Sequence, residues 1–179
     1  MNLFHFSDDP AIAHFAPRPV HTASARPPGR AWLNGPLVWA ISDERQGMYL
    51  FPRDCPRILL WPTEATTAED KARFWGDADW RMIAYVEEAW LDDIARAALY
   101  RYDMPIETFE SLDDAGMWIS RAPVTPFGIE VIADLAGALS QQRVELRALP
   151  TLAPLADVWS TTLHASGIRL RNARNWPRS

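Results

Sequence analysis

The chain has 179 residues, of which 48% are apolar, and it carries a formal net charge of −5 at pH 7. This length fits one domain with enough apolar material for a core. The negative charge excludes a protein that coats nucleic acid non-specifically, because such binding needs a basic face, so nucleic acid remains only as a local substrate. Cys55 is the one cysteine, which rules out an internal disulfide and indicates a reducing compartment.

Targeting and membrane signals are missing from the sequence. The first residues show no basic segment followed by an apolar stretch, and no apolar run reaches the roughly 20 residues that a membrane helix needs. We therefore expect a cytoplasmic protein with no membrane partner. Nine tryptophans are present, and we expect most of them in the core and in pocket walls, because each buries a large area and carries an N–H that needs an acceptor.

Strands and helices are predicted from the spacing of apolar residues and from capping residues. In chain order, the strands are expected at residues 3–7, 37–41, 58–61, 80–87, 117–120, 129–132 and 144–149. The helices are expected at residues 42–49, 67–75, 88–99, 134–142 and 152–164, with Ser42, Thr67 and Asp134 as caps. This irregular interleaving favours an α+β fold in a single domain, residues 1–179, over a doubly wound parallel sheet.

Two connections between these elements stand out. Residues 11–36 are rich in proline, arginine and small residues, and they are long for a structureless connection, which indicates a functional loop or a partly mobile one. Residues 51–57 form a stiff turn, because Pro52 and Pro56 each fix the backbone angle φ. Arg53 and Arg57 lie on this turn. They either form an Arg–Asp pair that locks it or present a guanidinium fork to phosphate or carboxylate; we favour the second interpretation.

The opening strand carries two polar residues on one face. His5 lies between Phe4 and Phe6 and therefore points away from both, and Ser7 follows on the same face as His5. The two residues are either ordinary surface or core residues or part of a binding site, in which a neutral imidazole would bind a ligand hydroxyl. We expect His5 and the guanidinium groups of the proline-braced turn to share one cavity.

Other candidate residues each have a structural alternative. Trp39 on a buried strand is either core packing or the wall of a flat ligand ring. Arg18 lies in the proline-rich loop, where an arginine is either exposed to solvent or a ligand contact, and we favour exposure. Arg121 ends a strand and is a candidate for the edge of a pocket. Three glutamates are candidate general bases or ribose ligands, although most glutamates on strands face water. They are Glu107, Glu130 and Glu145.

Metal and nucleophile sites are not predicted. The four histidines lack paired spacing and a single cysteine cannot form a thiolate site. Cys55 shows no partner base, which argues against a catalytic thiolate. The segment 168–174 places Arg169 and Arg171 on one face; it either contacts a polyanion or forms a structural tail with salt bridges, and we favour the tail.

The motifs resemble those of known groups of proteins. The pattern HFSDDP, PLVWAI and FPRDCPR, with SRAPVTP and IRLRNA later in the chain, resembles a group of uncharacterised bacterial proteins with no assigned activity. The first third of the chain is also similar to the ADP-ribosyltransferase superfamily, including its RNA 2′-phosphotransferase-like members. That resemblance rests on a strand with a histidine and a small hydroxyl residue, Leu3 to Ser7, and on the aromatic strand at residues 38–41.

The resemblance to the ADP-ribosyltransferase superfamily implies split sheets with flanking helices that bind NAD or a related nucleotide. By that likeness His5 binds a ribose hydroxyl, Ser7 frames the nicotinamide end and Trp39 walls the ring. The sequence departs from the pattern at Met117, where the superfamily often has a catalytic acid. Either another residue such as Glu107 or Glu130 supplies that acid, or the fold has lost transferase chemistry.

Three hypotheses of function follow. The first is an ADP-ribosyltransferase-like NAD-binding protein with His5 and Glu130 as catalytic residues. Its ligand contacts would come from Ser7, Arg18, Trp39, Arg53, Arg57 and Arg121. The second is a non-catalytic module that binds a small anionic ligand or a partner protein through the same arginines, and the third is a nucleotide hydrolase or lyase.

Overall fold

The computed structural model describes residues 1–23 and 26–177. It is a mixed structure, 23% helical and 30% strand, with two separate sheets. The chain forms two compact units, each built from two stretches of sequence: unit 1 is Met1–Gln46 with Leu99–Val131, and unit 2 is Gly47–Ala98 with Ile132–Ser179. The boundaries between the units fall inside or beside helices and strands, and no proline- or glycine-rich linker marks them.

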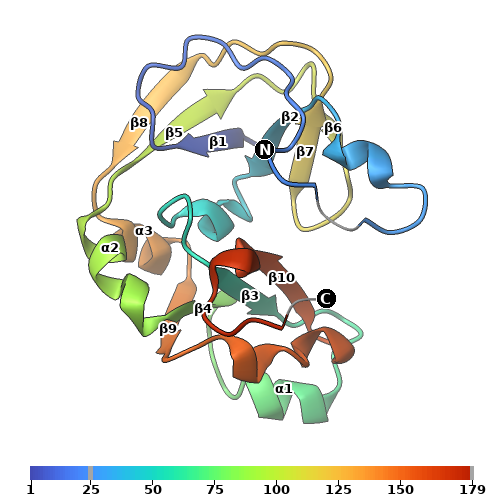
Figure 1. The fold of residues 1–179 in the computed structure, drawn as a ribbon, viewed down its shortest axis with the longest axis vertical. Coiled ribbons are helices and arrows are strands. Elements are labelled where there is room, and N and C mark those ends of the chain that lie inside the picture. Colours follow the sequence, from blue (N-terminus) through green and yellow to red (C-terminus); the bar gives the residue numbers. More distant parts are fainter. Residues whose placement is uncertain (24–25, 178–179) are drawn as a thin grey trace. The chain divides into compact units, whose positions relative to one another are not determined.

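Unit 1 contains a six-stranded sheet in the order β6-β7-β2-β1-β5-β8. In Figure 1 the blue strands β1 and β2 belong to the same sheet as the yellow-green to orange strands β5 to β8, so segments far apart in the sequence are neighbours. The strands are β1 (Leu3–Ser7), β2 (Val38–Ser42), β5 (Leu99–Met104), β6 (Glu110–Ser111), β7 (Met117–Ser120) and β8 (Gly128–Ile132).

Both faces of this sheet are packed with apolar side chains. One face carries a buried cluster that includes Leu3, Ala40 and Tyr102, covered by Phe15 and Val124. The opposite face carries a second cluster, with Trp39 packed against it; its buried members are Leu33, Leu37 and Ile119. The sheet is therefore the centre of unit 1, and a side chain on one face is separated from the other face by the backbone.

The long loop at residues 11–36 is ordered in part by pairing with the sheet. Phe15 is buried and forms an isolated antiparallel bridge with Val124, and Arg18 forms another with Leu37. A short 3-10 helix, η1 (Ala31–Asn34), follows. The described part of this loop is therefore attached to the sheet of unit 1 at two points.

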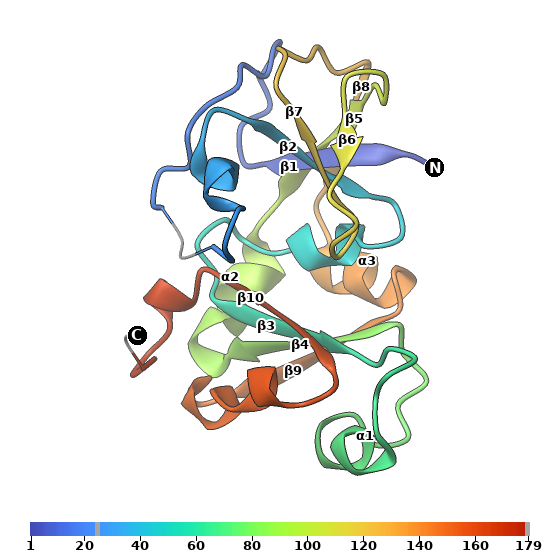
Figure 2. The same ribbon diagram turned by 90° about the vertical axis from the view of Figure 1, so that its right-hand side faces the viewer.

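Unit 2 contains a four-stranded sheet in the order β10-β3-β4-β9, drawn in Figure 2. Its strands are β3 (Arg57–Trp61), β4 (Met82–Glu87), β9 (Val144–Leu149) and β10 (His164–Ile168). Its helices are α1 (Ala68–Phe74), α2 (Leu91–Arg96), α3 (Leu135–Gln141) and the 3-10 turns η2 (Gln46–Tyr49), η3 (Glu88–Trp90), η4 (Ala153–Leu155), η5 (Val158–Ser160) and η6 (Leu170–Asn172). Every residue of β3 and β4 is buried, which makes them the core of the unit. Among the described helices, none is long and apolar enough to cross a membrane.

Two of the three predicted caps are confirmed; Ser42 is instead the last residue of β2, and of the helix predicted at residues 42–49 only the 3-10 turn η2 forms. The Thr67 hydroxyl accepts a hydrogen bond from the Asp70 backbone N–H at 3.2 Å, and the Asp134 carboxylate accepts one from Gly137 at 2.8 Å. Each bond satisfies a backbone donor that the first helical turn leaves without an intrahelical partner. The beginnings of α1 and α3 therefore lie where the sequence predicted them.

Two further predicted helices are wrong in part. Residues 152–164 form η4 and η5 and then enter β10, because the hydroxyls of Ser160 and Thr161 bond to the carbonyls of Asp157 and Val158 and compete with helical bonds. The helix predicted at 88–99 ends at Arg96, and the next strand, β5, was not predicted. Alanines at helical spacing had extended the predicted helix as far as the start of that strand.

Candidate functional site

The predicted site residues fall in both units. Unit 1 contains His5, Ser7, Arg18, Trp39, Arg121 and Glu130, whereas unit 2 contains Arg53 and Arg57. The opening strand and the proline-braced turn, which we expected to share one cavity, thus belong to different compact units. The candidate site is therefore built from unit 1 alone, around His5.

His5 lies where the pairing between β1 and β2 stops. The two strands pair as far as Phe4, whose partner is Ile41. His5 is the next residue, and its imidazole Nδ1 lies 2.8 Å from the carbonyl oxygen of Trp39 on β2. Since a carbonyl only accepts, Nδ1 carries the proton, and in the neutral imidazole Nε2 is then the acceptor nitrogen. The fold thus fixes both the orientation and the tautomer of His5.

Aromatic side chains surround the imidazole. The Phe15 ring lies 4.6 Å from the His5 ring, centroid to centroid, and the Tyr102 ring meets Phe15 edge-on at 5.2 Å. The Tyr102 hydroxyl donates to the carbonyl of Asp9 at 2.6 Å and accepts from the backbone N–H of Ile12 at 3.1 Å. These bonds hold the segment after β1 against the sheet, so that His5 is half-buried in a preformed aromatic setting.

Ser7 lies on the same face of β1 as His5, as the alternation along a strand requires. It is buried, and its hydroxyl oxygen accepts a hydrogen bond from the backbone N–H of Asp9 at 3.1 Å. The Asp9 carboxylate in turn accepts one from Ala11 at 2.8 Å. Ser7 therefore fixes the turn that ends β1 and places a second polar group beside His5.

Trp39 does not share this face. Phe4 and Ile41 are register partners and so point to one side of the sheet; Trp39, two residues from Ile41, points to that side, and His5 points to the other. The interpretation of Trp39 as a ring wall beside His5 is corrected accordingly. Trp39 packs on the opposite cluster, and its indole N–H is buried without an acceptor among the described residues.

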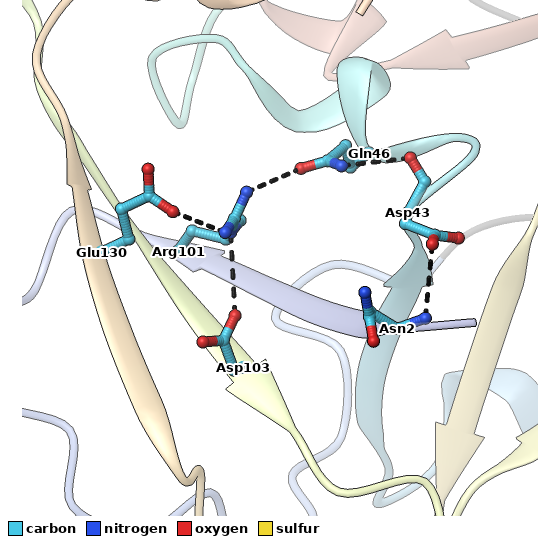
Figure 3. A network of polar contacts seen from close by, with 6 residues as sticks. All are labelled: Asn2, Asp43, Gln46, Arg101, Asp103 and Glu130. Carbon is cyan, nitrogen blue, oxygen red and sulfur yellow. Dashed lines mark hydrogen bonds and ion pairs between the residues drawn. The ribbon is translucent and has the colours of Figure 1, made fainter.

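Glu130 is also on the side away from His5. Figure 3 shows its carboxylate against the guanidinium of Arg101, an ion pair of 2.5 Å. Arg101 stacks over the Phe4 ring at 4.3 Å, which places the pair on the Phe4 face of the sheet. His5 and Glu130 therefore do not form a catalytic pair on one face, and Glu130 serves to join β8 to β5.

Arg101, which the sequence did not single out, is the centre of this polar network (Figure 3). Its guanidinium donates to the Gln46 side chain at 3.3 Å and lies 3.8 Å from the Asp103 carboxylate. Gln46 in turn donates to the Asp43 carbonyl at 3.1 Å. Because two carboxylates and an amide oxygen surround one cation, the network is an internal brace, and no net positive charge remains there for an anionic ligand.

The two candidate arginines of unit 1, Arg121 and Arg18, differ in how much they are engaged. Arg121 forms an ion pair with Glu110 at 2.6 Å and stacks over the ring of Trp32 at 4.9 Å. Arg18 is exposed, its backbone pairs with Leu37, and its guanidinium makes no hydrogen bond or ion pair within residues 1–23 and 26–177. Arg18 is thus the more available cation for a ligand phosphate.

Arg57 in unit 2 is turned inward. Its guanidinium donates to the carbonyls of Met48 at 2.9 Å and Cys55 at 3.0 Å, and it lies over the rings of Tyr49 and Phe51. Burial lowers its pKa to about 10. The fork that the sequence assigned to phosphate is therefore used to hold the proline-braced turn, through backbone carbonyls and not through the Arg–Asp pair of the structural alternative.

The backbone of the same turn receives the tail of the chain. Arg169 donates to the carbonyl of exposed Arg53 at 3.2 Å, and the Asn172 amide donates to that of Asp54 at 2.8 Å. Arg169 also forms an ion pair with the Asp54 carboxylate at 3.9 Å. The tail is structural, as the sequence favoured, and it occupies part of the turn that was a candidate for anion binding.

Cys55 is predicted to be inert in the folded protein. It is fully buried, and burial raises the pKa of its thiol from 9.0 to about 12, so the thiolate is scarce at neutral pH. We expect a thiol-specific disulfide reagent at pH 8 to modify the native chain at least ~100-fold more slowly than the urea-unfolded chain. Equal rates for the two forms would contradict the burial of Cys55. The contribution of the protonated thiol to stability is complete below pH 9 and is lost as the pH rises toward 12.

Comparisons with known proteins place the chain in a family. The model of the Family of unknown function (DUF6886) matches residues 4–173, and the chain belongs to that family. The match covers both units and every candidate residue named above. No curated protein and no solved structure matches the chain. Within the described residues, no group of three or more histidine, cysteine, aspartate or glutamate side chains is arranged to hold a metal ion.

Proposed function

We propose that unit 1 binds a nucleotide in the manner of the ADP-ribosyltransferase superfamily, with NAD as the ligand and His5 as the acceptor for a ribose hydroxyl. The observation that supports this proposal is the bond from His5 Nδ1 to the Trp39 carbonyl at 2.8 Å, at the point where the pairing between β1 and β2 ends. With the proton on Nδ1, the acceptor nitrogen of the neutral imidazole is Nε2, and a sugar hydroxyl is a donor of the matching kind.

The neighbours of His5 fit the other parts of a nucleotide. Ser7 supplies a hydroxyl two residues away on the same face, and the Phe15 ring supplies an apolar surface beside the imidazole. Among the arginines that the sequence assigned to the site, Arg18 has a guanidinium available for a diphosphate, and we assign that contact to it in place of Arg53 and Arg57. Ligand binding then requires side chains of unit 1 only.

The proposal concerns the binding of a nucleotide, and it does not include the transfer of ADP-ribose. A transferase needs a carboxylate near the ribose, and Glu130, the candidate for that role, is bonded to Arg101 on the other face of the sheet. A nucleotide-binding module needs no such acid. The alternatives that remain are a module for another small anionic ligand and a nucleotide hydrolase or lyase, and the same titrations separate them.

Calorimetry of the full chain with NAD, ADP-ribose and an RNA carrying a 2′-phosphate tests the proposal. We expect saturable binding of NAD and ADP-ribose. We expect Arg18→Gln to weaken the binding of ADP-ribose and to leave unchanged the binding of nicotinamide riboside, which has no phosphate. Arg121→Gln, whose guanidinium is already paired, is the matched control. The absence of binding at millimolar ligand overturns the proposal. Release of nicotinamide from bound NAD identifies an enzyme, and its absence identifies a binding module.

A further inference from the structure

Unit 2 holds a surface pocket of about 500 Å³ that the proposed nucleotide site does not use. Its wall is the end of α1 and the turn at residues 75–80, and its floor is Tyr85 on β4 with Glu145 and Arg147 on β9. Tyr85 and Arg147 are register partners, and Glu145 is two residues before Arg147, so the three side chains share one face of the sheet. A volume of this size fits a small organic molecule.

The donors on the floor of the pocket are already engaged. The Arg147 guanidinium donates to the Tyr85 hydroxyl and to one carboxylate oxygen of Glu145, both at 2.9 Å. The Tyr85 hydroxyl donates a hydrogen bond to the carbonyl of Phe74 at 3.4 Å. The hydrogen bond with Glu145 raises the pKa of Arg147, so the guanidinium stays charged and stays in this chain of bonds.

Two donors of the wall, on Trp75 and Arg73, are engaged as well. The indole N–H of Trp75 bonds to the carbonyl of Ala78 at 3.0 Å. The Arg73 guanidinium forms an ion pair at 2.7 Å with Asp157, which does not line the pocket. An anionic ligand would therefore have to displace an existing partner from either arginine of the pocket.

Unpaired carboxylate oxygens and the partly exposed indole of Trp80 remain available in the pocket. Asp77 makes no side-chain hydrogen bond or ion pair with the described part of the chain, and the second oxygen of Glu145 is likewise unbonded there. Trp80 is 37% exposed at the pocket. With Asp79 included, the lining has three carboxylates against two arginines, a formal charge of −1.

We propose that this pocket binds a small organic cation, an alkyl compound that ends in an ammonium or guanidinium group. Such a group donates to the free carboxylate oxygens of Asp77 and Glu145 and is attracted to the face of the Trp80 indole. A phosphate-bearing ligand is opposed by the charge of the lining. The site is independent of the proposed nucleotide site, because all of its residues lie in unit 2.

Titration of the full chain with agmatine, followed by two-dimensional NMR, tests this site. We expect saturable shifts of the Trp80 indole signal, an affinity about tenfold weaker in Asp77→Asn, and about fivefold weaker in Trp80→Leu, as the loss of one cation–π contact predicts. Both residues are exposed, so the melting temperature is expected to stay the same. Glu64→Gln removes an exposed carboxylate outside the pocket and is the charge-matched control.

Three results would overturn the proposal. They are a lack of saturable shifts at millimolar agmatine, an Asp77→Asn protein that binds as well as the unmodified chain, and an equal loss in Asp77→Asn and Glu64→Gln. The last result would show that agmatine responds to the overall negative charge and not to the pocket. A failure of NAD binding leaves this test unaffected, since the ligand, the residues and the unit differ.

Discussion

Replacing Arg57 with methionine is expected to lower the free energy of unfolding by about 3 kcal/mol, because two backbone carbonyls lose their donors inside the protein. These carbonyls belong to Met48 and Cys55, and the guanidinium that serves them is 3% exposed. Methionine fills much of the same volume, so the loss reports the hydrogen bonds more than a cavity. Urea unfolding of the full chain, followed by tryptophan fluorescence, measures the difference.

Arg57→Lys is the informative control for this prediction. It keeps a positive charge but replaces the planar fork with a single ammonium, which cannot reach both carbonyls in the same geometry. We expect the free energy of unfolding of Arg57→Lys to lie between that of the unmodified chain and that of Arg57→Met. If the free energy of unfolding of Arg57→Met is within about 0.5 kcal/mol of that of the unmodified chain, which is the range of an ordinary surface substitution, the guanidinium of Arg57 does not hold the turn.

The second large effect is expected at His5, where the structural and ligand roles can be separated. In His5→Asn, the side-chain amide nitrogen lies close to the former position of Nδ1 and can still donate to the Trp39 carbonyl. No atom of asparagine takes the place of Nε2. We expect at least a tenfold loss of NAD affinity with a change of no more than about 0.5 kcal/mol in stability. Calorimetry and urea unfolding on the same preparation give both values.

His5→Ala provides the comparison. It removes the donor to Trp39 and the contact with the Phe15 ring, so we expect a loss of about 1–2 kcal/mol in stability as well as the loss of affinity. Normal NAD binding by His5→Asn together with poor binding by His5→Ala would assign the imidazole to the structure of the sheet and would remove it from the ligand site.

The parts of the fold that sequence could predict are those set by neighbouring residues. The caps at Thr67 and Asp134 depend on atoms three residues apart, and both were predicted correctly. The division into two units depends on which strands pair across about a hundred residues, such as β1 with β5, and no local pattern encodes that choice. The strand β5 was not predicted, because alanines at helical spacing extended the predicted helix as far as its first residue.

The same distinction explains the candidate site. That His5 and Ser7 share a face follows from the alternation of a strand, which is a local property. The placement of Trp39 and Glu130 on the other face follows from the register with Ile41 and from the ion pair with Arg101, which are both long-range. The inward orientation of the Arg57 guanidinium could not be predicted either, because the conformation of the backbone that supplies its acceptors is not set by a local sequence pattern.

The central claim is that NAD contacts the imidazole of His5, and nitrogen NMR of the histidine side chains tests it most directly. The chain has four histidines, and His5→Asn identifies the signals of His5 by their loss. On titration with NAD, we predict a saturable shift of the His5 Nε2 resonance, while Nδ1 keeps the proton that it donates to Trp39 and the signals of His14, His21 and His164 stay in place. Saturable NAD binding that leaves His5 Nε2 unmoved would contradict the account, as would an Nε2 that carries the proton in the free protein.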